Sequence, residues 1–193
     1  NYVFDFYKNN FGNFSWFFGS GFDSANGLLS TIHYGTNYEN AFWNGTQMVY
    51  GDGGSTFLPF SGSLDVVAHE ITHGVTEAIN NLIYSQEPGA LNESWSDVVG
   101  MFTSIDYGDD LPYWMAENIM KNSKGPYYAM RRLDDPPFRT DSYPENNYNP
   151  QDPLNSWGQP EHTSEQYHAG SWPWTDNGGV HENSGIPNKA AYL

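Results

Sequence analysis

The chain of 193 residues contains no cysteine. This absence excludes a disulfide scaffold and a cysteine-type zinc finger, so any transition metal must be held by histidine and carboxylate side chains. Positive charge is also scarce, because 7 Lys and Arg residues stand against 23 Asp and Glu residues and give a formal net charge of −16. Phosphate backbones and anionic lipid surfaces would repel such a chain. Nucleic-acid binding and membrane-surface binding are therefore poor first hypotheses.

Long hydrophobic runs are missing as well, and no stretch approaches the roughly 20 residues that span a bilayer. Aromatic residues, by contrast, make up 17% of the chain and hydrophobic residues 38%. This content argues against a disordered acidic tail and predicts one ordinary domain or two small lobes. Residues 1–4 show neither an initiator methionine nor a signal-peptide pattern, so we expect a targeting segment to have been removed.

Local patterns predict two ordered segments in the first quarter of the chain and an irregular stretch later. Residues 2–11 are expected to form a short helix that ends at Gly12. Asn44-Gly45 separates two runs of aromatic and β-branched residues. This predicts a β-hairpin at 40–50, because both turn residues tolerate positive φ. Residues 105–180 are rich in Pro, Asp, Asn, Tyr and Gly without a sustained period, so we expect a long irregular segment there.

Helical periodicity is strongest in two neighbouring segments. In residues 64–80 an apolar stripe lies opposite a polar stripe when positions are spaced at about 100° per residue. After an expected break at 87–89, residues 91–104 again have an apolar side and a polar side. A last helix is expected to begin at Ser184, whose side chain can cap it, with a proline tolerated in its first turn. The apolar stripe of the first helix consists of Leu64, Val67, Ala68, Ile71, Val75 and Ala78.

The polar stripe of the first helix carries His69-Glu70-Ile71-Thr72-His73, an H-E-x-x-H motif. Two histidines at i and i+4 lie on one helix face, so their imidazoles can converge on one metal ion. Glu70 lies on the same side, near enough to reach a metal-bound water without being a ligand. The alternative is a pair of surface histidines on a solvated helix face. The motif favours a zinc site, since it is a known zinc signature.

A catalytic zinc site needs three protein ligands and an open position. Glu93, on the polar side of the next helix and 20 residues after His73, is the candidate third ligand. Two neutral histidines and one carboxylate leave a net charge of +1, which lowers the pKa of a bound water to about 7. Asp97, one turn beyond Glu93, can accept the outer N–H of a ligating histidine. By itself it would be better explained as a surface acid, but its register with Glu93 favours the role beside the ligand. Asp65 lies one turn before His69, near the same stripe.

Four blocks of the sequence resemble the thermolysin-like family of neutral zinc metalloendopeptidases, which are gluzincins. The blocks are NAFWNG at 40–45, VVAHEITHGVT at 66–76, GALNESWSD at 89–97, and DNGGVH at 176–181 with NSG at 183–185. The resemblance implies an α+β, two-lobed zincin fold with the zinc helix at the cleft. Residues 1–62 would form a β-rich lobe with the substrate-binding hairpin, and residues 63–193 a helical and irregular lobe with the zinc site. Family members are longer, so the chain is expected to be truncated at both ends.

The resemblance implies a zinc-dependent endopeptidase that hydrolyses internal peptide bonds. Glu70 would take a proton from the zinc-bound water, which attacks the scissile carbonyl, and deliver that proton to the leaving amine. Tyr84 and His181 would stabilise the resulting oxyanion, and Asp176 would orient His181. From the residues alone, His181 is equally explained as a loop histidine and Tyr84 as a half-buried aromatic residue.

The resemblance also assigns substrate-binding residues. A peptide would add as an antiparallel strand beside the hairpin, held by the Asn40 side chain and the Ala41 backbone. Arg131 would bind a substrate carbonyl, but a shift of one residue in the match would give this role to Arg132. An apolar pocket would accept the side chain after the scissile bond, which implies cleavage before hydrophobic residues, although its residues are also explained as core. The pocket residues are Phe57, Phe60, Val66 and Met130.

The sequence departs from the family at its usual calcium position beside the second helix. Ser104 stands where family members have an acid, and residues 111–117 lack much of the acidic pattern. Acids clustered in a loop are more often simply solvated. Zinc is the expected cofactor. Because the usual calcium position is altered, calcium is a second expectation, at a differently built site. Oxygens for that site would come from Asp65, Asp106, Asp109 and Asp110.

Polypeptides are the expected substrates, with neither nucleic acid nor membrane as a partner. A pro-segment or missing flanking segments of the same protein are the other expected partners. Secretion is inferred from the family, the absence of cysteine and the acidic composition. Two alternatives stay open. A catalytically silent metal- or peptide-binding module is disfavoured by the retained Glu70, and a zinc aminopeptidase would need a group that recognises a free N-terminal amine.

Overall fold

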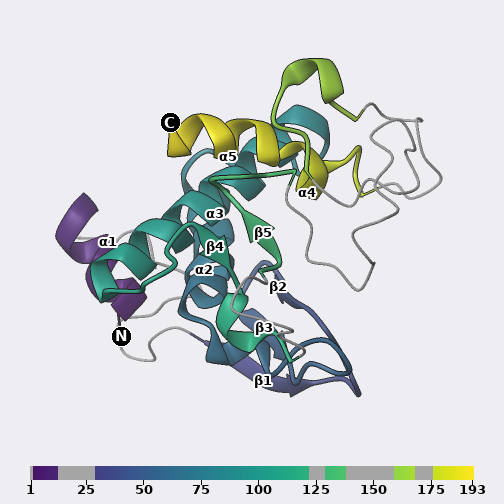
Figure 1. Ribbon diagram of the computed structural model, residues 1–193. Helices are drawn as coiled ribbons and strands as arrows, with labels where there is room; N and C mark the ends of the chain where they lie inside the picture. The colour runs from purple at the N-terminus through teal and green to yellow at the C-terminus, as the bar shows by residue number, and fades with distance from the viewer. Residues whose placement is uncertain (1, 13–28, 122–128, 138–158, 168–175) are drawn as a thin grey trace.

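The structure, a computed structural model, describes residues 2–12, 29–121, 129–137, 159–167 and 176–193 (Figure 1). Helix α1 (Tyr2–Phe11) opens the chain and ends at Gly12, which has a φ of 88°. Its buried residues Val3, Phe6 and Tyr7 belong to the main hydrophobic core. The Tyr7 hydroxyl hydrogen-bonds to the Thr72 hydroxyl over 2.5 Å. The predicted N-terminal helix is therefore confirmed, and its apolar side is part of the core that supports the site.

A three-stranded sheet follows, made of β1 (Ser30–Tyr34), β2 (Ala41–Trp43) and β3 (Met48–Gly51). Its order is β1-β3-β2, with β2 antiparallel and β1 parallel to β3. The Asn44 side chain accepts hydrogen bonds from the backbone N–H groups of Thr46 and Gln47, and Gly45 has a φ of 90°. These contacts close the turn, so the predicted hairpin is confirmed. Among the described strands, β2 lies at an edge of the sheet.

Helix α2 (Leu64–Ile79) follows a 3₁₀ turn at Phe60–Gly62 and is capped at Asn80, as the periodicity predicted. Ala68, Ile71 and Val75 are buried in the core. Ala78, the last residue of the predicted apolar stripe, is exposed, because the helix end extends beyond the core. The opposite stripe is not solvated either, since His69, Glu70 and Thr72 are also buried. The middle of α2 is thus enclosed on both its apolar and its polar side.

Helix α3 (Gln86–Tyr107) is longer than the predicted 91–104 and contains the expected break at 87–89. The predicted break is wrong, because the helix runs through 87–89. Pro88 is tolerated there since it lies in the first turn, where a backbone N–H has no helical partner anyway. The polar side of the helix faces inward, with Glu93 and Asp97 fully buried. Trp95 and Phe102, on the apolar side, are roughly half exposed. Buried acids therefore come from α3 as well as from α2.

The stretch predicted to be irregular contains short elements within its described parts. Strands β4 (Trp114–Met115) and β5 (Arg131–Arg132) pair antiparallel, and 3₁₀ turns span Glu117–Ile119 and Thr163–Glu165. Residues 122–128, 138–158 and 168–175 of that stretch lie outside the described residues. Two helices end the chain, α4 (Val180–Asn183) and α5 (Gly185–Tyr192). Ser184 stands at the start of α5 but does not cap it, because its hydroxyl donates to the carbonyl of His181 instead.

Figure 1 shows α2 and α3 in the middle of the molecule, with the three-stranded sheet below them and α4 and α5 above. The core packs around Phe60, Met48 and Ile71, between the sheet and α2. The predicted combination of a β-sheet toward the N-terminus and helices toward the C-terminus is confirmed. None of the described helices is both long and apolar enough to cross a membrane.

Candidate metal centre

Three side chains converge between α2 and α3, two of them buried and the third, His73, partly buried. His69 and His73 come from successive turns of α2, and Glu93 comes from α3. The Nε2 atoms of His69 and His73 lie 2.9 Å apart. His69 Nε2 lies 3.3 Å from Glu93 Oε2, and His73 Nε2 lies 3.3 Å from Glu93 Oε1. Among the described residues, this is the one group of three histidine or acidic side chains with donor atoms within 4.8 Å of one another. The predicted ligand set is thus brought together, with Glu93 pointing toward both histidines.

The donor set fits a zinc ion. Two atoms that bind zinc at about 2.0–2.2 Å lie no more than about 4.4 Å apart. The two Nε2 atoms satisfy this limit, and each also lies within it of a different oxygen of Glu93, His69 of Oε2 and His73 of Oε1. The Oε2 atom of Glu93 is buried and lies 3.3 Å from His69 Nε2. Burial would raise the pKa of Glu93, but hydrogen bonds from the two histidines hold it well below its usual value. An ionised carboxylate beside two imidazoles is a ligand set that zinc prefers.

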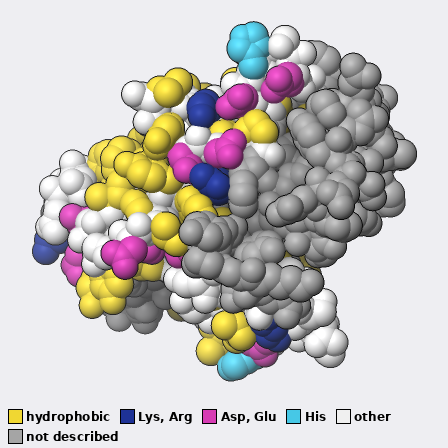
Figure 2. Space-filling model, viewed as in Figure 1, with side chains coloured by type: hydrophobic (Ala, Val, Ile, Leu, Met, Phe, Trp, Pro, Cys, Tyr) yellow, Lys and Arg dark blue, Asp and Glu magenta, His cyan; other side chains and the backbone are white. Residues whose placement is uncertain are grey.

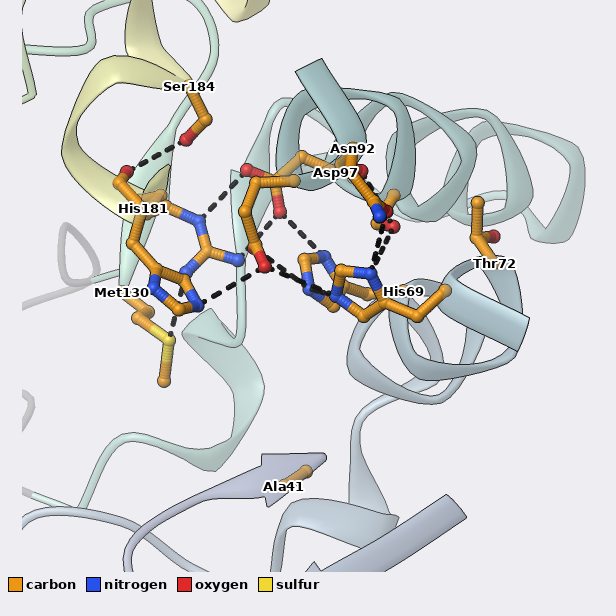
Figure 3. Close-up of polar contacts among 12 residues, drawn as sticks. Ala41, His69, Thr72, Asn92, Asp97, Met130, His181 and Ser184 are labelled. Carbon is orange, nitrogen blue, oxygen red and sulfur yellow. Dashed lines mark hydrogen bonds and ion pairs between the residues drawn. The ribbon is translucent and has the colours of Figure 1, made fainter. Parts of the chain in front are cut away.

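Contacts on the far side of each ring fix how the histidines face the centre (Figure 3). His69 Nδ1 lies 2.9 Å from Asp97 Oδ1, where the sequence predicted an outer acceptor. His73 Nδ1 lies 2.9 Å from Asn92 Oδ1 and 3.3 Å from the Ser96 hydroxyl. Such partners set the tautomer and the orientation of metal-binding imidazoles. Asn92 and Ser96 were not singled out from the sequence, although both lie beside Glu93 on the inward side of a predicted helix.

Charge around the centre shifts the pKa values of His69 and Asp97 in opposite directions. Burial would lower the pKa of His69, yet Asp97 and Glu93 outweigh it and raise the pKa to about 10. Burial would raise the pKa of Asp97, but Arg131 and His69 hold it well below its usual range. Asp97 is therefore ionised at neutral pH and can only accept hydrogen bonds.

Glu70 lies next to this trio and contributes to the wall of the same cleft. Only 6% of it is exposed, and among the described residues its Oε2 atom has no hydrogen-bond partner. Burial raises the pKa of Glu70, and the neighbouring His69 and His73 partly oppose that shift. A carboxyl group with a raised pKa and a free oxygen is suited to accept and return a proton.

Tyr84 and His181 reach the same centre from other elements. The Tyr84 hydroxyl donates to Glu93 Oε1 and lies 3.3 Å from His181 Nε2. On the far side of the ring, His181 Nδ1 lies 2.8 Å from Asp176 Oδ1, and Asp176 Oδ2 accepts the backbone N–H of His181. Burial would lower the pKa of His181, but Asp176 and Glu93 raise it above its usual value. Two groups able to donate hydrogen bonds therefore lie against Glu93 at the side of the trio.

The cleft has a volume of about 710 Å³ and gathers most of the predicted substrate-binding residues. Phe57 is the exception among them, because it does not line the cleft but packs behind Phe60, with ring centroids 5.1 Å apart. Trp43 and Glu77, which the sequence did not single out, also line it, and the Trp43 indole N–H donates to Glu77 over 2.6 Å. The predicted residues that line the cleft are Asn40, Ala41, Phe60, Val66, Met130 and Arg131.

The structure distinguishes the two adjacent arginines. Arg131 lines the cleft and donates to both carboxylate oxygens of Asp97, at 2.6 and 2.9 Å. Arg132 points elsewhere, pairing with Asp134 at 2.6 and 2.9 Å and lying over the Trp114 ring. Arg131 is thus the arginine within reach of a ligand in the cleft.

The region considered for calcium is arranged around Asp65. Its oxygens accept hydrogen bonds from the Ser63 hydroxyl and from the backbone N–H groups of Val66 and Ala116. Asp65 therefore joins α2 to the segment that follows β4 through protein donors. Ser104 is buried, and Asp109 accepts the backbone N–H of residue 111. Nothing here tests the calcium expectation, which stays a prediction.

Two family models match the chain over nearly all of its length. The model described as "Thermolysin metallopeptidase, catalytic domain" matches residues 1–77. The model described as "Thermolysin metallopeptidase, alpha-helical domain" matches residues 80–193. The residues at the metal centre are divided between the two, with both histidines in the first match and Glu93 in the second.

Individual relatives agree with these models. A bacillolysin of Bacillus caldolyticus is 43% identical over 193 residues, which cover 99% of this chain and 30% of the relative. Neutral protease NprE of Bacillus pumilus is 43% identical over 191 residues, covering 98% of this chain and 53% of the relative. A solved structure, the precursor of protealysin, a metalloproteinase from Serratia proteamaculans, matches with a TM-score of 0.70 and 36% identity. That match covers 100% of this chain and 57% of the other, so the chain spans 30 to 57% of these relatives.

Proposed function

The chain belongs to the thermolysin metallopeptidase family, and on this premise we propose that its protein is a zinc-dependent endopeptidase. The proposed reaction is hydrolysis of internal peptide bonds before hydrophobic residues. One observation carries the proposal: His69, His73 and Glu93 converge beside the buried Glu70 in a cleft that an edge strand borders. A purely structural metal site would need no proton acceptor at that place.

His69, His73 and Glu93 would hold the zinc ion, which when bound acidifies water and polarises a carbonyl group. Glu70 would accept a proton from the attacking water and return it to the leaving amine, as its raised pKa favours. Tyr84 and His181 would donate hydrogen bonds to the carbonyl oxygen as it becomes negative. Both groups lie against Glu93 and line the same cleft as Glu70, which supports these separate tasks.

Substrate would bind as an extended strand beside β2, which has a free edge in the described sheet. The Ala41 N–H donates to the Asn40 side-chain oxygen over 2.9 Å, which fixes this carboxamide so that its NH₂ group can donate to a peptide carbonyl. Arg131 would bind a carbonyl further along the peptide. The apolar part of the cleft would take the side chain after the scissile bond, and this part is formed by Phe60, Val66 and Met130 with Phe57 behind them.

Several broader features are proposed with the same function. The lobes at residues 1–62 and 63–193 would border the cleft, and the protein would be secreted. A pro-segment is proposed as a partner, supported by a structural relative described as a precursor. Calcium is kept as a second cofactor to be tested. The silent-module and aminopeptidase alternatives are not favoured, because Glu70 is in place and the family models are those of thermolysin peptidases.

The test is Glu70→Gln, assayed on a peptide whose N-terminus is blocked. The variant should retain one zinc ion while kcat/KM falls by about 10²–10⁴, since the amide cannot accept the proton. Glu87→Gln, at an exposed position near the start of α3, is the matched control and should cleave normally. Normal turnover by Glu70→Gln, or an intact blocked peptide with the zinc-loaded wild type, would reject the proposal.

A further inference from the structure

Asn188 connects the last helix of the chain to the metal centre. It lies in α5, is fully buried, and donates from Nδ2 to Asp97 Oδ2 over 2.9 Å. Asp97 is the acid whose other oxygen lies 2.9 Å from His69 Nδ1. A contact across 91 residues of sequence thus reaches the carboxylate that holds a ligand imidazole.

The direction of the Asn188 amide follows from its partner. Asp97 is an ionised acceptor, so only the NH₂ end of the amide can face it. The oxygen end then points away and, within the described residues, finds no donor although it is buried. A buried oxygen without a donor is unfavourable. If this position only filled space, a leucine of similar size would be more favourable. The hydrogen bond that the Asn188 NH₂ group donates to Asp97 explains why an asparagine stands there.

The two carboxylate oxygens of Asp97 contact three side chains, those of Arg131, His69 and Asn188. Oδ1 accepts from Arg131 Nη2 at 2.6 Å and faces His69, whereas Oδ2 accepts from Arg131 Nε at 2.9 Å and from Asn188. Asp97 is fully buried, so water does not replace a lost donor easily. Without Asn188, Oδ2 would keep a single donor, and the carboxylate would be freer to rotate away from His69.

We propose that Asn188 is a positioning residue for the metal centre: with Arg131 it fixes Asp97, and Asp97 fixes the imidazole of His69. The inference rests on the proposed zinc site. Arg131 and Asn188 both donate to Asp97, but their expected roles differ, because Arg131 also lines the cleft and Asn188 does not. Loss of Asn188 therefore acts on metal retention and not on direct contact with a peptide.

The experiment replaces Asn188 by Leu in the purified, zinc-loaded protein and follows the transfer of zinc to a chelator. Zinc release should be roughly tenfold faster, in the range seen when outer partners of metal ligands are removed. The absorption spectrum of the cobalt-substituted variant should shift, because His69 is less firmly held. Asn188→Asp, which keeps the shape but places a second carboxyl group against Asp97, should also release zinc faster and serves where the leucine variant does not fold.

Asn183→Leu is the matched control. Asn183 is a buried asparagine in α4 that exchanges hydrogen bonds with the backbone of Tyr167. Its loss should lower the melting temperature of the metal-free protein while zinc release and the cobalt spectrum stay as in the wild type. Wild-type zinc release by a folded Asn188 variant would overturn the inference. A wild type that binds no zinc would instead overturn the proposed function itself.

Discussion

At the scale of the residue, neighbouring hydrogen-bond donors decide which of the buried acids has a raised pKa and which has a lowered one. Glu70, Glu93 and Asp97 are all almost fully buried, and burial alone would raise the pKa of each. Glu93 and Asp97 face histidines or Arg131 at hydrogen-bonding distance, and their pKa values fall below the usual range. Glu70 has an oxygen with no partner among the described residues, and its pKa stays raised. Two acids are thereby suited to remain ionised and one to exchange a proton.

Asp176→Asn tests the role of His181 through the pH dependence of cleavage. If a protonated His181 is required, the rate falls as pH rises through its pKa, which Asp176 and Glu93 keep raised against the effect of burial. Removing the Asp176 charge lowers that pKa, so the alkaline limb of kcat/KM should move to lower pH by about one unit. The profile should be measured between pH 5 and pH 10. Asp52→Asn, beside the exposed His33, is the matched control and should leave the profile unchanged, and an unmoved limb in Asp176→Asn would contradict the assigned role.

At the scale of the element, helices and strands that several residues of a pattern support are predictable from the sequence, whereas those that depend on one or two residues are not. The hairpin at 40–50 and helix α2 followed from turn residues and periodicity. The start of α3 was misplaced because Pro88 was treated as a break, although a proline fits a first turn. Strands β4 and β5 have two residues each, too few to produce a period.

The candidate site divides in the same way. The zinc trio was predictable because motif spacing and helical faces carry geometric information. Asn188 carries no local signal, since its partner Asp97 lies 91 residues away and only tertiary packing brings the two together. Phe57 was assigned to the cleft from resemblance, and its place behind Phe60 depends on side-chain packing that sequence alone does not specify.

The 3₁₀ turn at Glu117–Ile119 provides a prediction at the same scale. Burial, with the charges of Asp65 and Asp109, raises the pKa of Glu117 to about 8. The folded state therefore retains a proton that the unfolded chain loses near the ordinary pKa of 4.5, so stability is lost as pH rises toward 8. Glu117→Gln cannot ionise, and its melting temperature should exceed that of the wild type by about 2–4 °C at pH 8 and by less at pH 5.

Thermal unfolding in zinc-containing, calcium-free buffer from pH 5 to pH 9 measures this difference. The exposed Glu87→Gln variant controls for the loss of one negative charge. A variant that is less stable than the wild type at pH 8, together with a wild type stabilised by millimolar calcium, would count against the prediction and in favour of a calcium ligand at Glu117.

At the scale of the whole molecule, the cleft depends on segments that are distant in sequence. Its walls come from the sheet edge near residue 41, the two central helices, Arg131 and His181. On the face shown in Figure 2, hydrophobic side chains gather on the side of the molecule where α1 and α3 lie. Tyr2 of α1 packs there against Tyr107 of α3, with ring centroids 4.5 Å apart. The site is therefore complete only when the chain is folded as a whole, and binding at its centre must be coupled to folding.

Zinc removal tests this coupling. His69, His73 and Glu93 lie on two helices that converge only in the folded state, so zinc binds the folded chain in preference to the unfolded one. Free zinc at 100 times its Kd should add about 2.7 kcal/mol to the free energy of unfolding. For a chain of this size the melting temperature should then rise by roughly 5–10 °C. Calorimetry in a metal buffer with stepwise increases in free zinc measures the rise. His73→Ala removes one ligand and should abolish most of it, whereas an equal rise in that variant would show that zinc stabilises the protein from somewhere else.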